Sequence, residues 1–281
     1  MQKVSDVDIL VIGGGPAGST AASMAAKYGL SVKICEKSKF PREHVGESLL
    51  PASIPILEEL GLGEKIKKAG FLPKYGATMV WGRDKTPWSW RFSETNKQNT
   101  HSYQVSRPIF DEILLRRSEE LGVSVEEEAT IDKVNLEESN RGAFVTSLNK
   151  GQYFQPANFI IDASGQSALI ARSLKIREWD ESFHNLAVYG YFSGATKLET
   201  PDENNIFIES YQNGWVWSIP LADGTTSVGV VVDSKNASTQ LQKTDPTEYL
   251  LSELSLSPKT ASLPFVYCSY LNADIFNFIP I

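Results

Sequence analysis

The sequence is poor in the residues that mark secreted, metal-binding and membrane proteins. It contains only two cysteines, Cys35 and Cys268, and both have apolar neighbours, so we expect free buried thiols in a reducing compartment. The three histidines lie far apart and form no metal-ligand spacing, which predicts no metal site. No apolar run approaches the roughly 20 residues of a membrane helix, and no secretory leader is recognisable. These absences predict a cytoplasmic protein with no membrane partner.

Positive charge is scarce as well. Lysine and arginine together number 27 against 34 acidic residues, which gives a formal net charge of −7. A nucleic-acid partner requires a basic face, so the composition predicts none. The 281 residues, of which 41% are hydrophobic, are enough for one large domain or two modest ones with a sizeable core.

The first 36 residues predict a Rossmann βαβ unit. Residues 7–12 form an apolar run typical of a buried parallel strand, residues 17–28 are rich in small residues typical of a helix, and residues 31–36 predict the next strand. A glycine-rich turn between the first strand and the helix fits the G-x-G-x-x-G pattern in the context that this pattern requires. We expect this turn to hold the pyrophosphate of a dinucleotide at the start of the helix, through Gly13, Gly15, Pro16, Ala17 and Gly18.

An acidic residue closes this unit. Glu36 ends the second strand, with Lys37 beside it, and both are predicted cofactor-binding residues. A carboxylate there can accept hydrogen bonds from the ribose hydroxyls and repels a 2′-phosphate, so NADP is disfavoured. The alternative is a glycine-rich turn without a ligand. The agreement of three glycines, a strand, a helix and an acid argues against that alternative.

Three later segments favour FAD over NAD. Gln104-Val105-Ser106-Arg107 before a predicted helix, Ile160 to Gly165 after a predicted strand, and Arg42 after the second strand resemble flavin-contacting positions of aromatic-hydroxylase-type flavoproteins. The resemblance implies that Arg42, Arg107, Asp162 and Gly165 bind FAD, with the aspartate facing the ribityl region. The alternative for Arg42, Arg107 and Asp162 is an ordinary surface ion pair or a helix-start residue.

Three further segments resemble the flavin-dependent halogenases. They are His44 to Pro51, which contains G-E-S-L-L-P, then Gly70 to Ala77 leading to Trp81-Gly82, and Gly214 to Leu221. The W-x-W-x-I-P signature of that family is matched at Trp215, Trp217, Ile219 and Pro220, and Lys74 falls where the family has its catalytic lysine. The resemblance covers residue 1 to about Val232. It is closest to members that act on phenols, pyrroles or carrier-bound aromatics.

The resemblance implies a reaction, its co-substrates and the residues that take part in it. Reduced FAD from a separate flavin reductase, together with O2 and chloride or bromide, would yield hypohalous acid, which Lys74 would present to a small aromatic substrate. Trp215 and Trp217 would separate that substrate from the flavin, and Ser48 would contact FAD. Judged without the resemblance, Lys74 is a solvated surface residue, and two tryptophans at i and i+2 are core residues of a sheet.

The C-terminal part departs from that family. Members continue with a Gly-Asp dipeptide and an F-x-x-P-x-x-S-x-G segment, and neither occurs after Val232. We therefore expect a chain shorter than a complete member, without the segment that in the family forms the halide site. Two alternatives stay open. One is a flavin monooxygenase or geranylgeranyl-reductase-like enzyme, and the other is an inactive fragment that binds at most the ADP moiety.

The predicted fold class is α/β. A Rossmann-type FAD-binding domain of the aromatic-hydroxylase type, residues 1–75 and 100–180, is interleaved with an antiparallel β-sheet substrate domain, residues 76–99 and 181–281. Within these domains we expect helices at residues 53–69, broken near 61–63, and at 108–121. We also expect a hairpin at 144–154 and a separate buried strand at 158–162.

Overall fold

The computed structural model describes residues 6–178, 180, 184–260 and 276–278. Cys268 and the segment around it lie outside these residues. The chain divides into two compact units, of which unit 1 comprises Met1–Val45, Ile56–Ala69 and Arg107–Glu178, and unit 2 comprises Gly46–Pro55, Gly70–Ser106 and Trp179–Ile281. The domain limits expected from the sequence stay a prediction. Among the described residues, no helix is long and apolar enough to cross a bilayer.

Unit 1 is built on a six-stranded sheet in the order β7-β2-β1-β10-β9-β8. β1 pairs in parallel with β2, as the βαβ pattern predicts. β1 also pairs in parallel with β10, and β2 with β7. The strands are β1 (Val7–Ile12), β2 (Val32–Cys35), β7 (Ser124–Glu126), β8 (Ala129–Asn135), β9 (Gly142–Ser147) and β10 (Gly151–Asp162).

One strand of this sheet differs from the prediction. β10 is a single strand of twelve residues, not a short hairpin arm followed by a separate strand. Its first half pairs antiparallel with β9 and its second half pairs in parallel with β1. The two pairings meet at Pro156, which is the last residue paired with β9 and precedes the first residue paired with β1. A proline, which is typical of a strand break, therefore lies within a continuous strand.

The helices of this part of the chain complete a layered α/β arrangement. α1 and α5 pack against each other, and Ala22 of α1 and Leu115 of α5 share a core cluster with Val11 and Ile34 of the sheet. The helices are α1 (Pro16–Lys27), α2 (Ser53–Glu59), α3 (Gly63–Lys68), α5 (Arg107–Glu120), α6 (Leu169–Ser173) and the 3-10 turns η1 (Glu138–Asn140) and η2 (Gly165–Ser167). The expected break near residues 61–63 separates α2 from α3.

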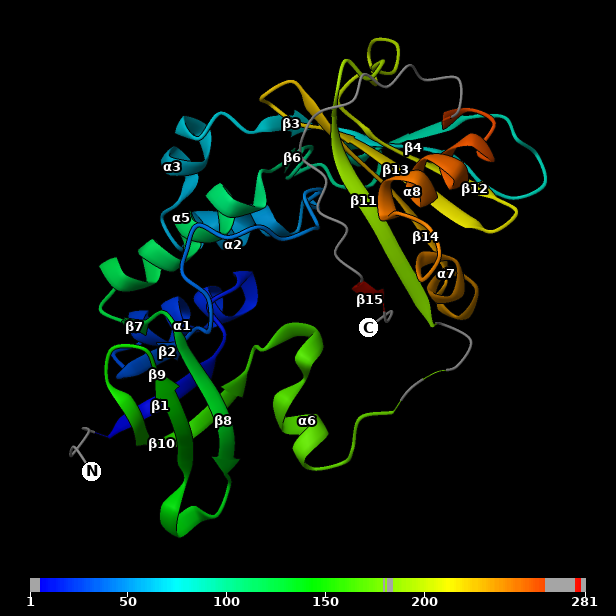
Figure 1. Cartoon of the computed structure of the whole chain (residues 1–281). Helices are drawn as coiled ribbons and strands as arrows, with labels where there is room; N and C mark the ends of the chain where they lie inside the picture. Colours follow the sequence, from blue (N-terminus) through cyan, green and yellow to red (C-terminus); the bar gives the residue numbers. More distant parts are fainter. Residues whose placement is uncertain (1–5, 179, 181–183, 261–275, 279–281) are drawn as a thin grey trace. The chain divides into compact units, whose positions relative to one another are not determined.

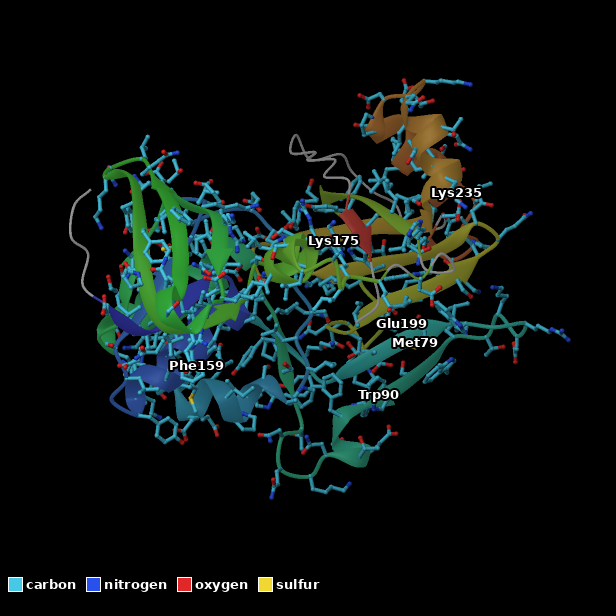
Figure 2. The ribbon with its side chains drawn as sticks, turned by 90° about the horizontal axis from the view of Figure 1, so that it is seen from below. Met79, Trp90, Phe159, Lys175, Glu199 and Lys235 are labelled. Atoms are coloured by element: carbon cyan, nitrogen blue, oxygen red, sulfur yellow. The ribbon has the colours of Figure 1, made fainter. Side chains whose placement is uncertain are left out.

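Unit 2 contains a seven-stranded sheet and a two-stranded one. The large sheet has the order β15-β11-β14-β13-β12-β4-β5, and its pairings are antiparallel except that of β12 with β4. Met79 and Trp90 mark the neighbouring strands β4 and β5 at one edge (Figure 2). The strands are β3 (Leu72–Lys74), β4 (Gly76–Val80), β5 (Trp88–Arg91), β6 (Ser102–Gln104), β11 (Asn185–Ser193), β12 (Ile206–Tyr211), β13 (Gly214–Pro220), β14 (Thr225–Asp233) and β15 (Phe276–Phe278).

The two faces of the large sheet differ. α7 (Ser234–Leu241) and α8 (Pro246–Ser255) lie on one face (Figure 1). α4 (Phe92–Thr95) follows β5 directly in the sequence. Val228, Val230 and Val232 of β14 alternate toward the helices and form a core with Leu250 and Leu254 of α8. Trp215 and Trp217 of β13 alternate with Val216 of this core and therefore lie on the opposite face. The mixed α/β architecture confirms the fold class expected from the sequence.

Candidate functional site

The glycine-rich turn lies where three parallel strands of unit 1 end together. Ile12, the last residue of β1, is in register with Cys35 of β2 and with Asp162 of β10. The segments that follow these strands therefore meet at the carboxyl edge of the sheet, the edge at which open α/β sheets bind their ligands. This edge brings together most of the predicted dinucleotide-binding residues.

Two glycines allow the turn to close. Gly13 has a φ of +98°, which favours glycine, and a Cβ on Gly18 would lie 1.9 Å from the carbonyl oxygen of Gly13. Pro16 and Ala17 then open α1, and among the described residues no side chain caps this helix. The first-turn amides of α1 lack intrahelical acceptors, so they can bind an anion such as a pyrophosphate.

Glu36 holds the turn from the next strand. Its side chain is buried, one carboxylate oxygen accepts a hydrogen bond from the Gly14 amide at 2.7 Å, and the other accepts one from the Ser38 amide at 2.8 Å. Lys37 beside it is exposed. The carboxylate fixes the backbone of the turn, and its contact with a ribose stays a prediction.

Asp162 has a comparable part at the end of β10. Its two carboxylate oxygens accept hydrogen bonds from the amide of Ser164 at 3.1 Å and from the amide of Ile170 at 2.7 Å. The second bond satisfies an amide in the first turn of α6, as expected of a residue near a helix start. Gly165, which has a φ of +62°, begins the intervening 3-10 turn. A contact of Asp162 or Gly165 with the flavin stays a prediction.

Arg42 and Arg107 share one buried carboxylate, that of Asp111. Arg107 binds it through two nitrogens, at 2.8 Å and 2.9 Å, and Arg42 binds it at 3.2 Å. Arg107 also donates to the carbonyl oxygen of Val45 at 2.6 Å. The ion-pair alternative therefore describes both arginines, although the acid is buried rather than exposed. Asp111 was not predicted from the sequence, although its i, i+4 spacing from Arg107 in α5 was an available signal.

Lys74 is buried, contrary to the surface alternative. Its side chain is 2% exposed, and its amine donates to the hydroxyl of Ser48 at 2.7 Å and to the carbonyl oxygen of Leu49 at 3.1 Å. The amine also lies 5.1 Å from the centre of the Phe92 ring. Burial lowers the pKa of this amine to about 8. A lysine with that pKa is partly unprotonated and nucleophilic near neutral pH.

The segment Gly46–Pro51 that contacts Lys74 is held on both sides. The Glu47 carboxylate accepts a hydrogen bond from the Tyr191 hydroxyl at 2.8 Å, and the Glu47 carbonyl accepts one from the Val105 amide at 2.8 Å. Lys74 itself pairs with Ser102 in the two-stranded sheet of β3 and β6. Glu47 lies within the G-E-S-L-L-P segment. That pattern does not indicate the hydrogen bond between Glu47 and Tyr191, which is 144 positions away in the sequence.

Trp215 and Trp217 lie on the face of the large sheet that is opposite α7 and α8. Their ring centres are 6.0 Å apart. Trp217 is buried, its indole N–H donates to the Ser227 hydroxyl at 3.1 Å, and a Cβ on Gly229 would lie 2.3 Å from its ring. Trp217 is therefore a sheet-core residue, while Trp215 is half-buried. Contact of either ring with a substrate stays a prediction.

Comparisons with known proteins agree with this geometry. Residues 6–258 match the family described as FAD binding domain. The flavin-dependent halogenase armH3 of Armillaria mellea is 41% identical over 235 residues, with 80% of this chain and 46% of that protein covered. A 1H-pyrrole-2-carbonyl-(peptidyl-carrier protein) chlorinase of Pseudomonas fluorescens is 36% identical over 255 residues, with 82% and 57% covered.

A solved structure agrees too. The myxobacterial chondrochloren halogenase CndH superposes with a TM-score of 0.85 at 35% identity, with 98% of this chain and 64% of that chain covered. The chain spans about half the length of the curated relatives it matches. The predicted resemblance to flavin-dependent halogenases and the expected cofactor, FAD, are both confirmed. The chain belongs to the FAD binding domain family.

Proposed function

We propose that this protein is an FAD-dependent halogenase that transfers chlorine or bromine to an electron-rich aromatic substrate. The observation that carries the proposal is the burial of Lys74, with its pKa lowered to about 8, at the position where the resembling family has its catalytic lysine. A lysine in a surface loop would have no such environment. The halogenases to which the chain is similar support the same chemistry.

The residues around Lys74 suit a lysine that transfers halogen to the substrate. Reduced FAD, when bound, would supply the O2 chemistry that oxidises a halide to hypohalous acid. As an ammonium, Lys74 would donate a hydrogen bond to the oxygen of that acid. As an amine, its nitrogen would take the halogen while the halogen–oxygen bond breaks, and one amine proton would join the departing hydroxide as water. The ring would then take the halogen from nitrogen, and the proton that the ring loses would return to the amine. Ser48 and Leu49 orient the amine, and Phe92 limits the access of water to it.

In unit 1, the dinucleotide-binding turn would hold the ADP moiety of FAD. The first-turn amides of α1 and the Arg42 guanidinium face the region where a pyrophosphate would bind, and the buried Glu36 lies at the end of the adjacent strand. The turn has room for a backbone approach, since a Cβ on Gly15 would contact only Arg42 among its described neighbours within 4 Å. The residues present therefore fit the group.

The substrate and partners form part of the proposal. The pyrrole-carrier chlorinase among the relatives supports a small phenol or pyrrole, free or bound to a carrier protein. A separate flavin reductase would supply reduced FAD, and the protein would act in the cytoplasm. Trp215 and Trp217 would line the substrate side of the sheet, and Ser48 would contact FAD.

The test is an assay of the protein with FAD, a flavin reductase, O2, chloride or bromide, and a panel of phenols and pyrroles. We expect halogenated product, lost in Lys74→Ala while FAD binding is kept. Lys235→Ala changes an exposed lysine of α7 and serves as the matched control (Figure 2). Hydroxylated product without halide dependence, or turnover that persists in Lys74→Ala, would favour a monooxygenase or reductase. A colourless protein that binds ADP alone would favour an inactive fragment.

A further inference from the structure

Asp111 of α5 is the most enclosed charged group beside the dinucleotide-binding turn. Its side chain is 0% exposed, and it accepts hydrogen bonds from Arg107 at 2.8 Å and 2.9 Å and from Arg42 at 3.2 Å. All three residues and the turn belong to unit 1. Two guanidinium groups therefore share the carboxylate of Asp111.

The two arginines differ in what else they contact. All three guanidinium nitrogens of Arg107 make hydrogen bonds, because the one that does not contact Asp111 donates to the carbonyl of Val45 at 2.6 Å. Arg42 lies over the turn, since one of its terminal nitrogens is 3.3 Å from the position of a Cβ on Gly15. Its guanidinium also lies 4.6 Å from the centre of the Phe40 ring, and 20% of its side chain remains exposed. Arg42 is therefore positioned close enough to the turn, and is exposed enough to solvent, to bind an anion at the start of α1.

We propose that Asp111 is a positioning residue for the diphosphate of FAD, which acts by holding Arg42 over the backbone of Gly15. Arg107 fixes Asp111 through the two-point contact and does not itself bind phosphate. A flexible arginine loses side-chain entropy when it binds an anion, and a buried carboxylate that restrains it beforehand reduces that loss. The proposal rests on FAD binding and not on halogenation, so a failure of either proposal can be told from a failure of the other.

Electrostatics and positioning predict opposite results for Asp111→Asn. Loss of the negative charge alone would strengthen the binding of a diphosphate, because the site becomes more positive. Loss of the restraint on Arg42 would weaken it. We expect FAD and ADP to bind Asp111→Asn about tenfold more weakly, and Arg42→Met about ten- to a hundredfold more weakly, as for a lost charge-assisted hydrogen bond. Adenosine, which has no phosphate, should bind all of these variants equally.

The experiment measures dissociation constants of FAD, ADP and adenosine by calorimetry, with folding checked by circular dichroism. Glu112→Gln, which removes a carboxylate from the same helix where it pairs with Arg116, is the matched control and should leave all three constants unchanged. If Asp111→Asn fails to fold, Arg107→Met/Asp111→Leu replaces the buried ion pair by apolar groups and still frees Arg42. The double variant Arg42→Met/Asp111→Asn should bind ADP no more weakly than Arg42→Met.

Several results would overturn the proposal. Tighter or unchanged ADP binding in Asp111→Asn would contradict positioning. An equal loss for adenosine would show that Asp111 merely maintains the fold, and additive losses in the double variant would show that Asp111 does not act through Arg42. If the unaltered protein bound no ADP, the inference would fall together with the FAD site, while the halogenation assay would still be judged by its own products.

Discussion

At the scale of single residues, Lys74 carries a cost in stability. Burial lowers the pKa of its amine from 10.5 to about 8, so the folded protein binds fewer protons than the unfolded chain between these two values. The free energy of unfolding therefore rises with pH across that window. Well below pH 8 the amine is protonated in both states, and its burial costs on the order of 3 kcal/mol. A residue that opposes folding to this extent is expected where its reactivity is used.

The corresponding prediction concerns Lys74→Met. At pH 7 we expect this variant to raise the free energy of unfolding by about 1–3 kcal/mol, because methionine fills the site without a charge, although two hydrogen bonds are lost. The gain should shrink as the pH rises from 8 toward 10. Urea unfolding of the variant and the unaltered protein across this pH range measures it, with Lys235→Met as the exposed control. A destabilised variant at pH 7 would show that the hydrogen bonds outweigh the burial of the charge.

At the scale of elements, the central strands of unit 2 fix the position of Trp217. Its indole lies across Gly229 of the adjacent strand β14 and beside Tyr189, with ring centres 6.1 Å apart. A Cβ at position 229 would lie 2.3 Å from the indole ring and 2.6 Å from the Cβ of Tyr189. Gly229 thus decides whether the W-x-W-x-I-P strand can carry a tryptophan at this position.

We therefore expect Gly229→Ala to destabilise the protein by about 1–3 kcal/mol, because the core must be overpacked or the indole displaced. Near-ultraviolet circular dichroism and tryptophan fluorescence should change with it. Combining Gly229→Ala with Trp217→Phe, whose smaller ring leaves space for the methyl group, should recover part of the loss. No recovery in the double variant would mean that the glycine is needed for strand geometry rather than for the indole.

The elements that local patterns specify were predicted from the sequence. The βαβ unit and α5 follow from their apolar periods and end signals, and both are found within one or two residues of their expected limits. What the sequence left open or misjudged involves contacts distant in the sequence. The continuity of β10, which was predicted as two separate strands, depends on two different partner strands. The burial of Lys74, for which a surface position was the alternative, depends on a segment more than twenty residues earlier. A local sequence pattern does not identify partners that are distant in the sequence.

At the scale of the whole molecule, the two compact units should respond differently to a nucleotide. All the residues that we assign to the ADP moiety belong to unit 1, whereas Lys74 and the tryptophan pair belong to unit 2. A ligand that binds only the folded form of unit 1 stabilises the opening reactions that break its site, by about 2.7 kcal/mol at one hundred times its dissociation constant. Openings confined to unit 2 leave the site intact and gain nothing.

Saturating ADP should therefore slow amide hydrogen exchange in residues 13–27 and 36–42 by up to about a hundredfold. In β11, β13 and β14 the exchange rates of amides that exchange by local opening should stay unchanged. Hydrogen-exchange mass spectrometry measures both sets of peptides in one sample. ADP carrying a 2′-phosphate is the control. The carboxylate of Glu36 should repel this ligand, so it should not slow exchange in either set of peptides. Equal slowing in both sets would show that the chain opens as one cooperative unit, and the division into two domains would then be wrong.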